Sequence, residues 1–237
     1  MTGTDTGVGK TVVTAALAVC LRRRGLSVGV MKPVETGCGV GLPGRSDADR
    51  LRAGAECDAP MDLLSPYRFA APLAPLAAAR QAGVVVSVDR IVQAYRRLAA
   101  RYPAILVEGA GGLLVPLTDR DDVRDLIERL ALPVVLVGRC ALGGVNHALL
   151  TIEALRARGI PLLALVLNRQ APYQAASDEA VQLASTVELL KERNGVPVIG
   201  PLPYLDSLAV MEREGVSELS RDPGIEALSD LLNRARP

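Results

Sequence analysis

The fold class follows from one short stretch near the start of the chain, Gly3-Thr4-Asp5-Thr6-Gly7-Val8-Gly9-Lys10-Thr11. This glycine-rich turn ends in Gly-Lys-Thr and runs directly into an amphipathic segment over residues 12–24. Such a turn points consecutive backbone N–H groups at a phosphate, and the dipole of the following helix adds to the attraction. The sequence therefore predicts a P-loop, in which Lys10 neutralises the outer phosphates of a nucleotide and Thr11 ligates Mg²⁺.

The stretch departs from the usual P-loop pattern at one position. The pattern places a glycine five residues before the glycine of Gly-Lys-Thr, where this chain has Thr4. The alternative interpretation is a solvated glycine-rich turn that only caps a helix.

Outside this stretch, short β-branched runs alternate with longer amphipathic segments, which is typical of βα units around a mostly parallel sheet. Strands are expected at residues 27–31, 104–107, 133–137, 162–167 and 196–199, and helices at 10–24, 46–55, 88–101, 122–131, 143–158 and 174–193. Gly25, Gly159 and Gly195 follow three of these helices, as C-cap glycines do. Residues 1–237 are therefore expected to form one α/β domain, a P-loop NTPase fold with helices on both faces of the sheet.

Three local expectations accompany this fold. Residues 63–75 carry three prolines and are expected to form a surface loop before a short helix. The segment from Ser217 onward is expected to be one terminal helix.

A P-loop usually follows a central strand of about five residues, but here only Met1 and Thr2 precede Gly3. We expect the natural protein to carry about five or more apolar, β-branched residues before Met1.

Composition and charge argue against several classes of protein. A net charge of +1 with no Trp and one Phe offers neither a basic surface nor stacking platforms for nucleic acid. The longest apolar runs, such as residues 162–167, are far shorter than the ~20 residues of a membrane span. The first residues do not resemble a secretory signal, so we expect a cytoplasmic protein. The four cysteines are widely spaced, which predicts reduced thiols without a zinc or redox motif.

Two carboxylates and a second lysine are candidates for chemistry. Glu108 ends the expected strand 104–107 and precedes Gly-Ala-Gly-Gly, so it would lie at the strand ends that line a ligand crevice and suit Mg²⁺. Lys32 and Pro33 directly follow another strand. The alternatives are an ordinary acid at a strand end and a lysine whose ammonium reaches out to solvent. Asp47, next to the possible N-cap Ser46, could equally complement a helix dipole.

The remaining titratable residues are less informative. Only three of the 27 basic residues are lysines, and two of them, Lys10 and Lys32, lie in glycine-rich or proline-flanked loops that favour a compact point charge. The single histidine, His147, has no Cys or acidic neighbours, which favours a packing or surface position over a metal site or catalytic triad.

Together these motifs resemble the ATP-dependent dethiobiotin synthetases, a family of the P-loop NTPase superfamily, over nearly the whole chain. The resemblance rests on GTDTGVGKT at 3–11, MKPVETG at 31–37, SDAD at 46–49, SPYRFAAPLAP at 65–75, VEGAGGLLVPL at 107–117, GGVNHALLTIEAL at 143–155, the strand end at Asn168, and GPLPYL at 200–205. Several ordered motifs that match at once are more specific than any one of them.

The resemblance implies a ligase of biotin biosynthesis that makes dethiobiotin from 7,8-diaminononanoate and CO₂, with ATP as co-substrate and Mg²⁺ as cofactor. One amine takes up CO₂ as a carbamate, ATP phosphorylates the carbamate to a carbamic-phosphoric anhydride, and the second amine closes the ureido ring. ADP and phosphate are released. It also implies a homodimer whose substrates are small molecules, with the site near the subunit interface and with neither nucleic acid nor a membrane as partner.

The resemblance assigns roles to individual residues. Lys10 and Lys32 resemble the catalytic cations, and Thr11, Asp47 and Glu108 the Mg²⁺ ligands. The nucleotide-binding residues would be Thr4, Asp5, Thr6, Gly7, Val8, Gly9, Lys10, Thr11, Glu108, Gly109, Ala110, Gly111, Asn168, Leu202, Pro203 and Tyr204. Thr36 would lie near the diamine and carbamate, and Gly143, Gly144 and Asn146 would bind the substrate carboxylate from the partner subunit.

Two other P-loop classes are alternatives. An ATP-driven switch of the partitioning-protein type usually carries a second lysine early in its P-loop, where this chain has Thr4, Asp5 and Thr6. A cobyrinate-type synthetase that uses glutamine needs a further domain with a catalytic cysteine, for which 237 residues leave no room.

Overall fold

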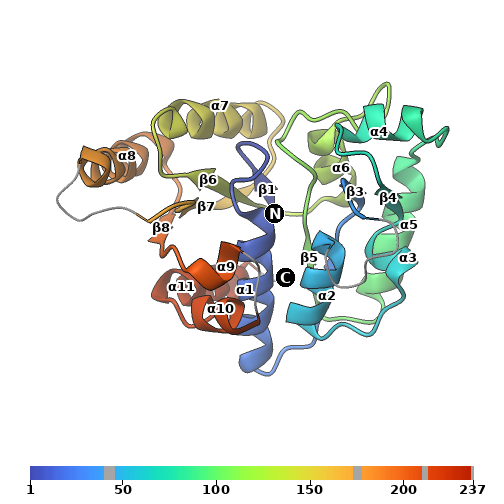
Figure 1. Ribbon diagram of the computed structural model, residues 1–237, viewed down its shortest axis with the longest axis horizontal. Helices are drawn as coiled ribbons and strands as arrows, with labels where there is room; N and C mark the ends of the chain where they lie inside the picture. Colours follow the sequence, from blue (N-terminus) through green and yellow to red (C-terminus); the bar gives the residue numbers. More distant parts are fainter. Residues whose placement is uncertain (40–45, 173–177, 210–212, 236–237) are drawn as a thin grey trace.

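The computed structural model describes residues 1–39, 46–172, 178–209 and 213–235, and all of its paired strands run parallel (Figure 1). The strands are β1 (Thr2–Gly3), β2 (Val28–Met31), β3 (Val34–Thr36), β4 (Tyr67–Phe69), β5 (Ala104–Val107), β6 (Val134–Arg139), β7 (Leu162–Asn168) and β8 (Val198–Leu202). They pair in the orders β1-β6-β7-β8, β2-β5 and β3-β4.

Helices cover both faces of the strands. They are α1 (Lys10–Arg23), α2 (Asp47–Ala55), α3 (Met61–Leu64), α4 (Pro75–Gln81), α5 (Val88–Ala99), α6 (Val123–Leu130), α7 (Gly144–Arg156), α8 (Asp178–Asn194), α9 (Asp206–Ala209), α10 (Arg213–Leu219) and α11 (Pro223–Arg234). Figure 1 shows α7 and α8 on one side of β6, β7 and β8, with α1, α10 and α11 on the other. This layering confirms the expected α/β class with helices on both faces of a parallel sheet.

β1 carries the P-loop and lies between β5 and β6. The Met1 amine donates to the Val107 carbonyl at 2.7 Å, and the Gly109 N–H donates to the Met1 carbonyl at 3.0 Å. On the other side, the Thr4 N–H donates to the Val137 carbonyl at 2.9 Å. The start of the P-loop is therefore hydrogen-bonded to both halves of the sheet, although β1 has only two residues.

Beyond Met1, the space between β5 and β6 is an apolar cavity, which we call the β5–β6 slot. Its lining is Met1, Leu17, Pro33, Ile105, Leu106, Val107, Gly109, Val123, Leu126, Ile127, Leu130, Leu132, Pro133, Val134, Val135 and Leu232. Within the described residues, β5 pairs with β2 alone, and β6 pairs with β1 only from Leu136 onward. All four residues of β5 are consequently only half-buried, although the strand is near the centre of the fold.

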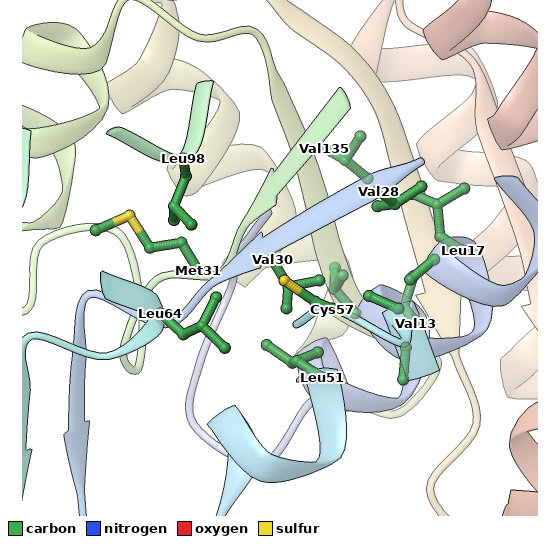
Figure 2. Close-up of a cluster of buried hydrophobic side chains, with 14 of the residues drawn as sticks. Val13, Leu17, Val28, Val30, Met31, Leu51, Cys57, Leu64, Leu98 and Val135 are labelled. Carbon is green, nitrogen blue, oxygen red and sulfur yellow. The ribbon is translucent and has the colours of Figure 1, made fainter. Parts of the chain in front are cut away.

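The largest core cluster packs α1 and α2 against the β2–β5 pair (Figure 2). Leu17 of α1, Leu51 of α2 and Met31 of β2 are all fully buried. Each side chain of this size contributes about 1.5–3 kcal/mol on burial. This packing fixes the P-loop helix relative to the end of β2, from which Lys32 projects.

Most expected elements are confirmed with boundaries shifted by one to three residues. The expected helix at 174–193 is α8, which begins at Asp178; residues 174–177 of that expectation lie outside the described residues. Gly25, Gly159 and Gly195 have φ angles of 82°, 65° and 66°, which confirms their position just past three helices.

Two expectations are wrong. Residues 63–75 are not all surface loop, because they include the end of α3 and strand β4, whose Tyr67 and Phe69 are buried. The segment from Ser217 onward is not one helix, because α10 ends at Leu219 and α11 begins at Pro223. Asp222 caps α11 by accepting the Gly224 N–H at 2.8 Å, and proline favours the first turn of a helix. The short strands β1, β3 and β4 were not predicted.

No helix in the described part of the chain is both long and apolar enough to cross a lipid bilayer.

Candidate active site

The P-loop adopts the conformation that its glycines predict. Gly7 and Gly9 have φ angles of 74° and 97°, a region open to glycine, and Gly9 is the N-cap of α1. The Lys10 ammonium bends back and donates to the Asp5 carbonyl at 2.9 Å, with the residue only 6% exposed. The loop therefore surrounds a cation and places the N-terminus of α1 behind it, which is an arrangement suited to phosphate.

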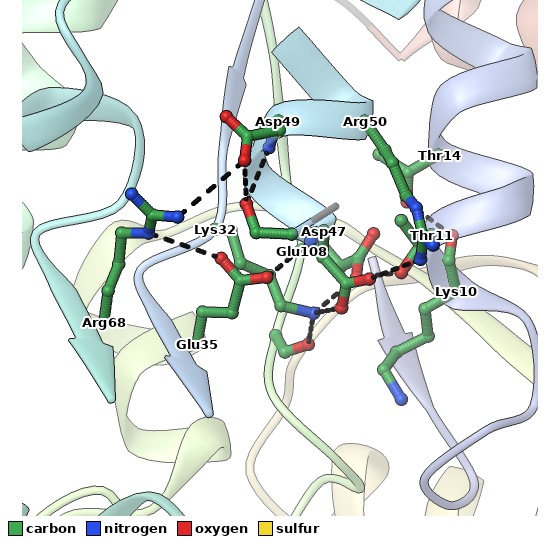
Figure 3. A network of polar contacts seen from close by, with 12 residues as sticks. Lys10, Thr11, Thr14, Lys32, Glu35, Asp47, Asp49, Arg50, Arg68 and Glu108 are labelled. Carbon is green, nitrogen blue, oxygen red and sulfur yellow. Dashed lines mark hydrogen bonds and ion pairs between the residues drawn. The ribbon is translucent and has the colours of Figure 1, made fainter. Parts of the chain in front are cut away.

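A buried group of charges lies next to the P-loop, and we call its residues Thr11, Lys32, Asp47 and Glu108 the ionic centre (Figure 3). The Lys32 ammonium lies 2.5 Å from Glu108 Oε1 and 3.1 Å from Asp47 Oδ2. The Thr11 hydroxyl donates to the same Glu108 oxygen at 2.8 Å. Four residues from α1, the end of β2, α2 and the end of β5 thus converge, as expected for the carboxyl ends of parallel strands.

The charges of this centre shift one another's pKa. Burial would lower the pKa of Lys32, but the charges of Glu108 and Asp47 outweigh burial and raise it above its ordinary value. Burial would raise the pKa of Asp47, but Lys32 and the Thr11 hydroxyl hold it below its ordinary value. In contrast, burial and the neighbouring Lys32 lower the pKa of Lys10 to about 8. Lys32 and Asp47 therefore stay charged near neutral pH, whereas Lys10 can lose its proton at mildly alkaline pH.

The oxygens of the ionic centre fit a hard divalent cation. Glu108 is fully buried, and its Oε2 has no hydrogen-bond partner among the described residues. Two carboxylates and a hydroxyl are the ligand types that Mg²⁺ takes beside phosphate oxygens and water. The Lys32 ammonium between the two carboxylates shows that they already face one position that accepts positive charge.

Two adjoining cavities extend from the P-loop. The first, of about 440 Å³, is lined by Thr6, Gly7, Gly9, Lys10, Thr11, Val12, Lys32, Val34, Glu35, Thr36, Asp47, Arg50, Ala110, Gly111 and Leu208. The second, of about 200 Å³, is lined by Gly7, Gly9, Val12, Asn168, Arg169, Gln170, Pro203, Tyr204, Leu205 and Leu208. Because Gly7, Gly9 and Leu208 line both, the two cavities are continuous along one side of the P-loop. A nucleotide could place its phosphates in the first and its base in the second.

Asn168 links the P-loop to the second cavity. Its side-chain amide donates to the Val8 carbonyl at 3.1 Å, and a Cβ built on Gly9 would lie 2.1 Å from its Nδ2. A side chain at position 9 is therefore excluded by close packing as well as by the positive φ. Leu202 is fully buried, accepts a hydrogen bond on its carbonyl from Arg169 at 3.1 Å, and does not line the second cavity, whereas Pro203 and Tyr204 do.

Three of the expected substrate residues lie elsewhere. Gly143, Gly144 and Asn146 form the start of α7 and line neither cavity of this chain. Arg139 lies beside them: a Cβ on Gly144 would be 2.4 Å from its carbonyl oxygen, and its guanidinium lies 3.3 Å from His147 Nδ1. The structure of one chain therefore does not bring the start of α7 to the ionic centre.

Several polar residues at the site were not predicted from the sequence. Glu35 of β3 is 4% exposed and accepts the backbone N–H of Asp47, and Arg50 lies 3.7 Å from the Asp47 carboxylate. The Gln170 side chain donates to the Gly7 carbonyl. Glu35 stands between Lys32 and Thr36 in the sequence, and this position was the available signal that it belongs to the site.

Comparison with known sequences identifies close relatives. An AAA domain matches residues 1–212. The chain is 42% identical over 243 residues to the ATP-dependent dethiobiotin synthetase BioD of Thermodesulfovibrio yellowstonii, a match that covers 98% of each chain. It is 54% identical over 172 residues to the protein of the same name in Anaeromyxobacter sp. strain K, covering 73% of this chain and 76% of the relative.

Solved structures with a similar fold are more distant in sequence. The MinC:MinD cell division protein complex of Aquifex aeolicus matches with a TM-score of 0.58 at 15% identity, covering 100% of this chain and 96% of that one. A cobyrinic acid a,c-diamide synthase of Mycobacterium smegmatis, solved with an ATP analogue and magnesium, matches with a TM-score of 0.52 at 15% identity, covering 98% and 91%. At this identity the likeness describes the fold alone.

Proposed function

The chain belongs to the ATP-dependent dethiobiotin synthetase family, and from this we infer that the cavity around the ionic centre is where it closes the ureido ring. The enzyme is an ATP-dependent ligase of biotin biosynthesis. It joins 7,8-diaminononanoate and CO₂ to give dethiobiotin while ATP is converted to ADP and phosphate.

One observation supports this location above the others: the buried Lys32 ammonium contacts the carboxylates of Asp47 and Glu108, and Lys32 and Asp47 line the cavity beside the P-loop. Phosphoryl transfer needs positioning and charge neutralisation more than covalent help from the protein. A carbamate is an anion, and it must approach the γ-phosphate, which is also anionic. Lys10 on the P-loop side and Lys32 on the opposite side would neutralise this repulsion.

The oxygens of Thr11, Asp47 and Glu108 would hold Mg²⁺, which supplies charge neutralisation at the phosphate oxygens when bound. The backbone N–H groups from Thr6 to Thr11 would bind the β-phosphate, and Ala110 and Gly111 allow the chain to pass close to it. The Asn168 amide, with Pro203 and Tyr204, would contact the base.

The carbamate and the diamine would lie in the first cavity near Thr36 and Lys32. One substrate amine adds to CO₂ and loses a proton, which gives the carbamate. The carbamate oxygen then attacks the γ-phosphorus, and the bond between that phosphorus and the β-bridging oxygen of ADP breaks. The second amine attacks the carbonyl carbon of the resulting anhydride, and phosphate leaves as the ring closes.

We propose that two copies of the chain form a dimer through the region of α7. The start of α7 would bind the substrate carboxylate, yet it lines neither cavity of its own chain, so a second copy would have to supply it. Leu142 before α7 and Leu150 within it are 83% and 61% exposed, as apolar interface residues of a lone subunit would be. Light scattering should give twice the 24.9 kDa chain mass, and Leu150→Asp should shift it toward one chain.

The decisive experiment measures ADP release and dethiobiotin formation with the diamine and bicarbonate present, and with each omitted. Both products should require the diamine, CO₂ and Mg²⁺ together, because the phosphate acceptor is a carbamate formed on the enzyme. ATP hydrolysis at the same rate with and without the diamine would instead favour a switch of the partitioning-protein type.

We place the enzyme in the cytoplasm, where ATP is made available to biosynthetic ligases.

A further inference from the structure

The Asp47 carboxylate belongs to the first residue of a helix, so its position depends on how that helix is held. α2 begins at Asp47, and the hydroxyl of its N-cap Ser46 accepts the Asp49 N–H at 3.0 Å. The first N–H groups of a helix have no partner within the helix. Something outside α2 must therefore accept the N–H groups of Asp47 and Ala48, since the start of the helix is buried.

Glu35 of β3 is that acceptor. Its Oε1 accepts the Asp47 N–H, and the neighbouring Ala48 N–H also favours the charged form of this carboxylate. The carboxylate points at the N-terminal end of α2, where the helix dipole favours negative charge. It contacts the backbone of Asp47, so it is placed to orient this proposed metal ligand.

Arg68 of the neighbouring strand forms long ion pairs with Glu35 and with the first turn of α2. Glu35 and Arg68 are register partners in the β3–β4 pair. Arg68 Nε lies 3.9 Å from Glu35 Oε2, and Arg68 Nη2 lies 3.8 Å from Asp49 Oδ2, so one guanidinium spans β3 and the first turn of α2 (Figure 3). Ser46 completes the contacts by donating to Asp49 at 2.8 Å.

We propose that Glu35, steadied by Arg68, is a positioning residue that fixes the Asp47 carboxylate in the ionic centre by holding the start of α2 against β3. The inference rests on the proposed function of Asp47 as a Mg²⁺ ligand. It also couples two parts of the site, because Thr36, expected near the diamine, directly follows Glu35 on β3.

The test is calorimetric titration of Mg²⁺ into the full-length protein saturated with ADP. Glu35→Ala should weaken Mg²⁺ binding by about tenfold or more, the usual cost of losing a group that orients a ligand. Glu35→Gln keeps an oxygen acceptor for the Asp47 N–H and should recover part of the loss. Arg68→Met should have a smaller effect than Glu35→Ala, because its contacts are long and its side chain is 34% exposed. In turnover, half-saturation by Mg²⁺ should rise by the same factor as the binding constant.

Ser87→Ala is the matched control, because it removes the N-cap of α5, which accepts the Arg90 N–H at 3.3 Å, without touching the site. It should leave Mg²⁺ affinity unchanged at a similar loss of melting temperature. Wild-type Mg²⁺ affinity in Glu35→Ala, or in Asp47→Asn, would overturn the proposal, as would an equal loss in Ser87→Ala. If Glu35→Ala fails to fold, Glu35→Gln and Arg68→Met with wild-type affinity would overturn it. A wild-type protein that binds Mg²⁺ and ADP but makes no dethiobiotin would refute the proposed function alone.

Discussion

The two ends of the central strands contrast sharply in how their polar groups are satisfied. At the carboxyl ends, the Lys32 ammonium contacts both Asp47 and Glu108, and the Thr11 hydroxyl bonds to the same acid. At the amino ends, the edges of β5 and β6 face the apolar β5–β6 slot. The first region is dense with charge, and in the second no strand of the described residues lies between the facing edges of β5 and β6.

This contrast indicates that the apolar end contributes to stability without taking part in the chemistry, whereas the charged end bears on both. The ionic centre is assembled by α1, α2, and the residues that follow β2 and β5, each of which packs in the main core. Removing one partner of a buried ion pair leaves the other charge uncompensated, which is costly. A change in the slot alters only apolar contacts and strand pairing. These affect the free energy of unfolding but not the arrangement of charges.

The largest expected effect separates the two regions directly. Glu108→Gln removes the charge of a proposed metal ligand and should lower turnover by about 10²-fold or more, as loss of a transition-state electrostatic group does. Its melting temperature should also fall, because Lys32 keeps only one of its two carboxylate partners. In the slot, Leu126→Ala should lower the melting temperature but keep kcat within about twofold, because the side chain is buried and lines the apolar slot, outside both cavities of the site. Near-normal turnover in Glu108→Gln would remove Glu108 from the site.

A second experiment fills the slot and tests the expectation of an apolar strand ahead of Met1. Four apolar, β-branched residues added before Met1 would lie opposite the four residues of β5. After the entropy cost of ordering, they should add about 3 kcal/mol to the free energy of unfolding and about 6–12 °C to the melting temperature.

An extension of four Gly and Ser residues is the control, since it has the same length but no apolar surface. It should leave the melting temperature unchanged. If both extensions melt alike, the slot does not accept a strand, and the expectation is wrong.

A third prediction concerns protons at the charged end. Because burial and Lys32 lower the pKa of Lys10 to about 8, the free protein loses this proton as the pH rises above about 8. Bound phosphates restore the pKa, so nucleotide binding should take up nearly one proton at about pH 9 and weaken by up to tenfold per pH unit. Calorimetry in two buffers of different ionisation enthalpy measures the uptake. Binding without a buffer effect would contradict the lowered pKa.

The smallest expected effect lies at the start of α7, remote from both regions in a single chain. Asn146→Ala should raise the diamine KM by about threefold to tenfold, the cost of one hydrogen bond to a charged group, with little change in the ATP KM. Steady-state kinetics with each substrate varied separately measures the difference. Equal changes in both KM values would place Asn146 outside the carboxylate site.

The sequence predicted a residue's position correctly where a single physical reason explains that residue type at that position. The P-loop glycines required positive φ, and Glu108 ended a clear apolar strand, so both could be placed from the sequence. The three-residue strands β3 and β4 were missed, because such short runs have no readable period. The role of Glu35 was missed for a related reason: its partners lie on α2 and β4, far along the chain. The break before α11 was signalled by Asp222 and Pro223 and was overlooked.

The contrast between the lysines has a consequence for covalent labelling. Acylating reagents react with neutral amines, so Lys10 should become reactive near pH 8, whereas Lys191 is open to the reagent because it is exposed. Lys32, whose pKa is raised by two carboxylates, should stay unmodified until one of those acids is removed. With only three lysines in the chain, peptide mass spectrometry could follow each one separately. Acylation of Lys10 would therefore measure occupancy of the P-loop, with acylation of Lys191 as the internal standard.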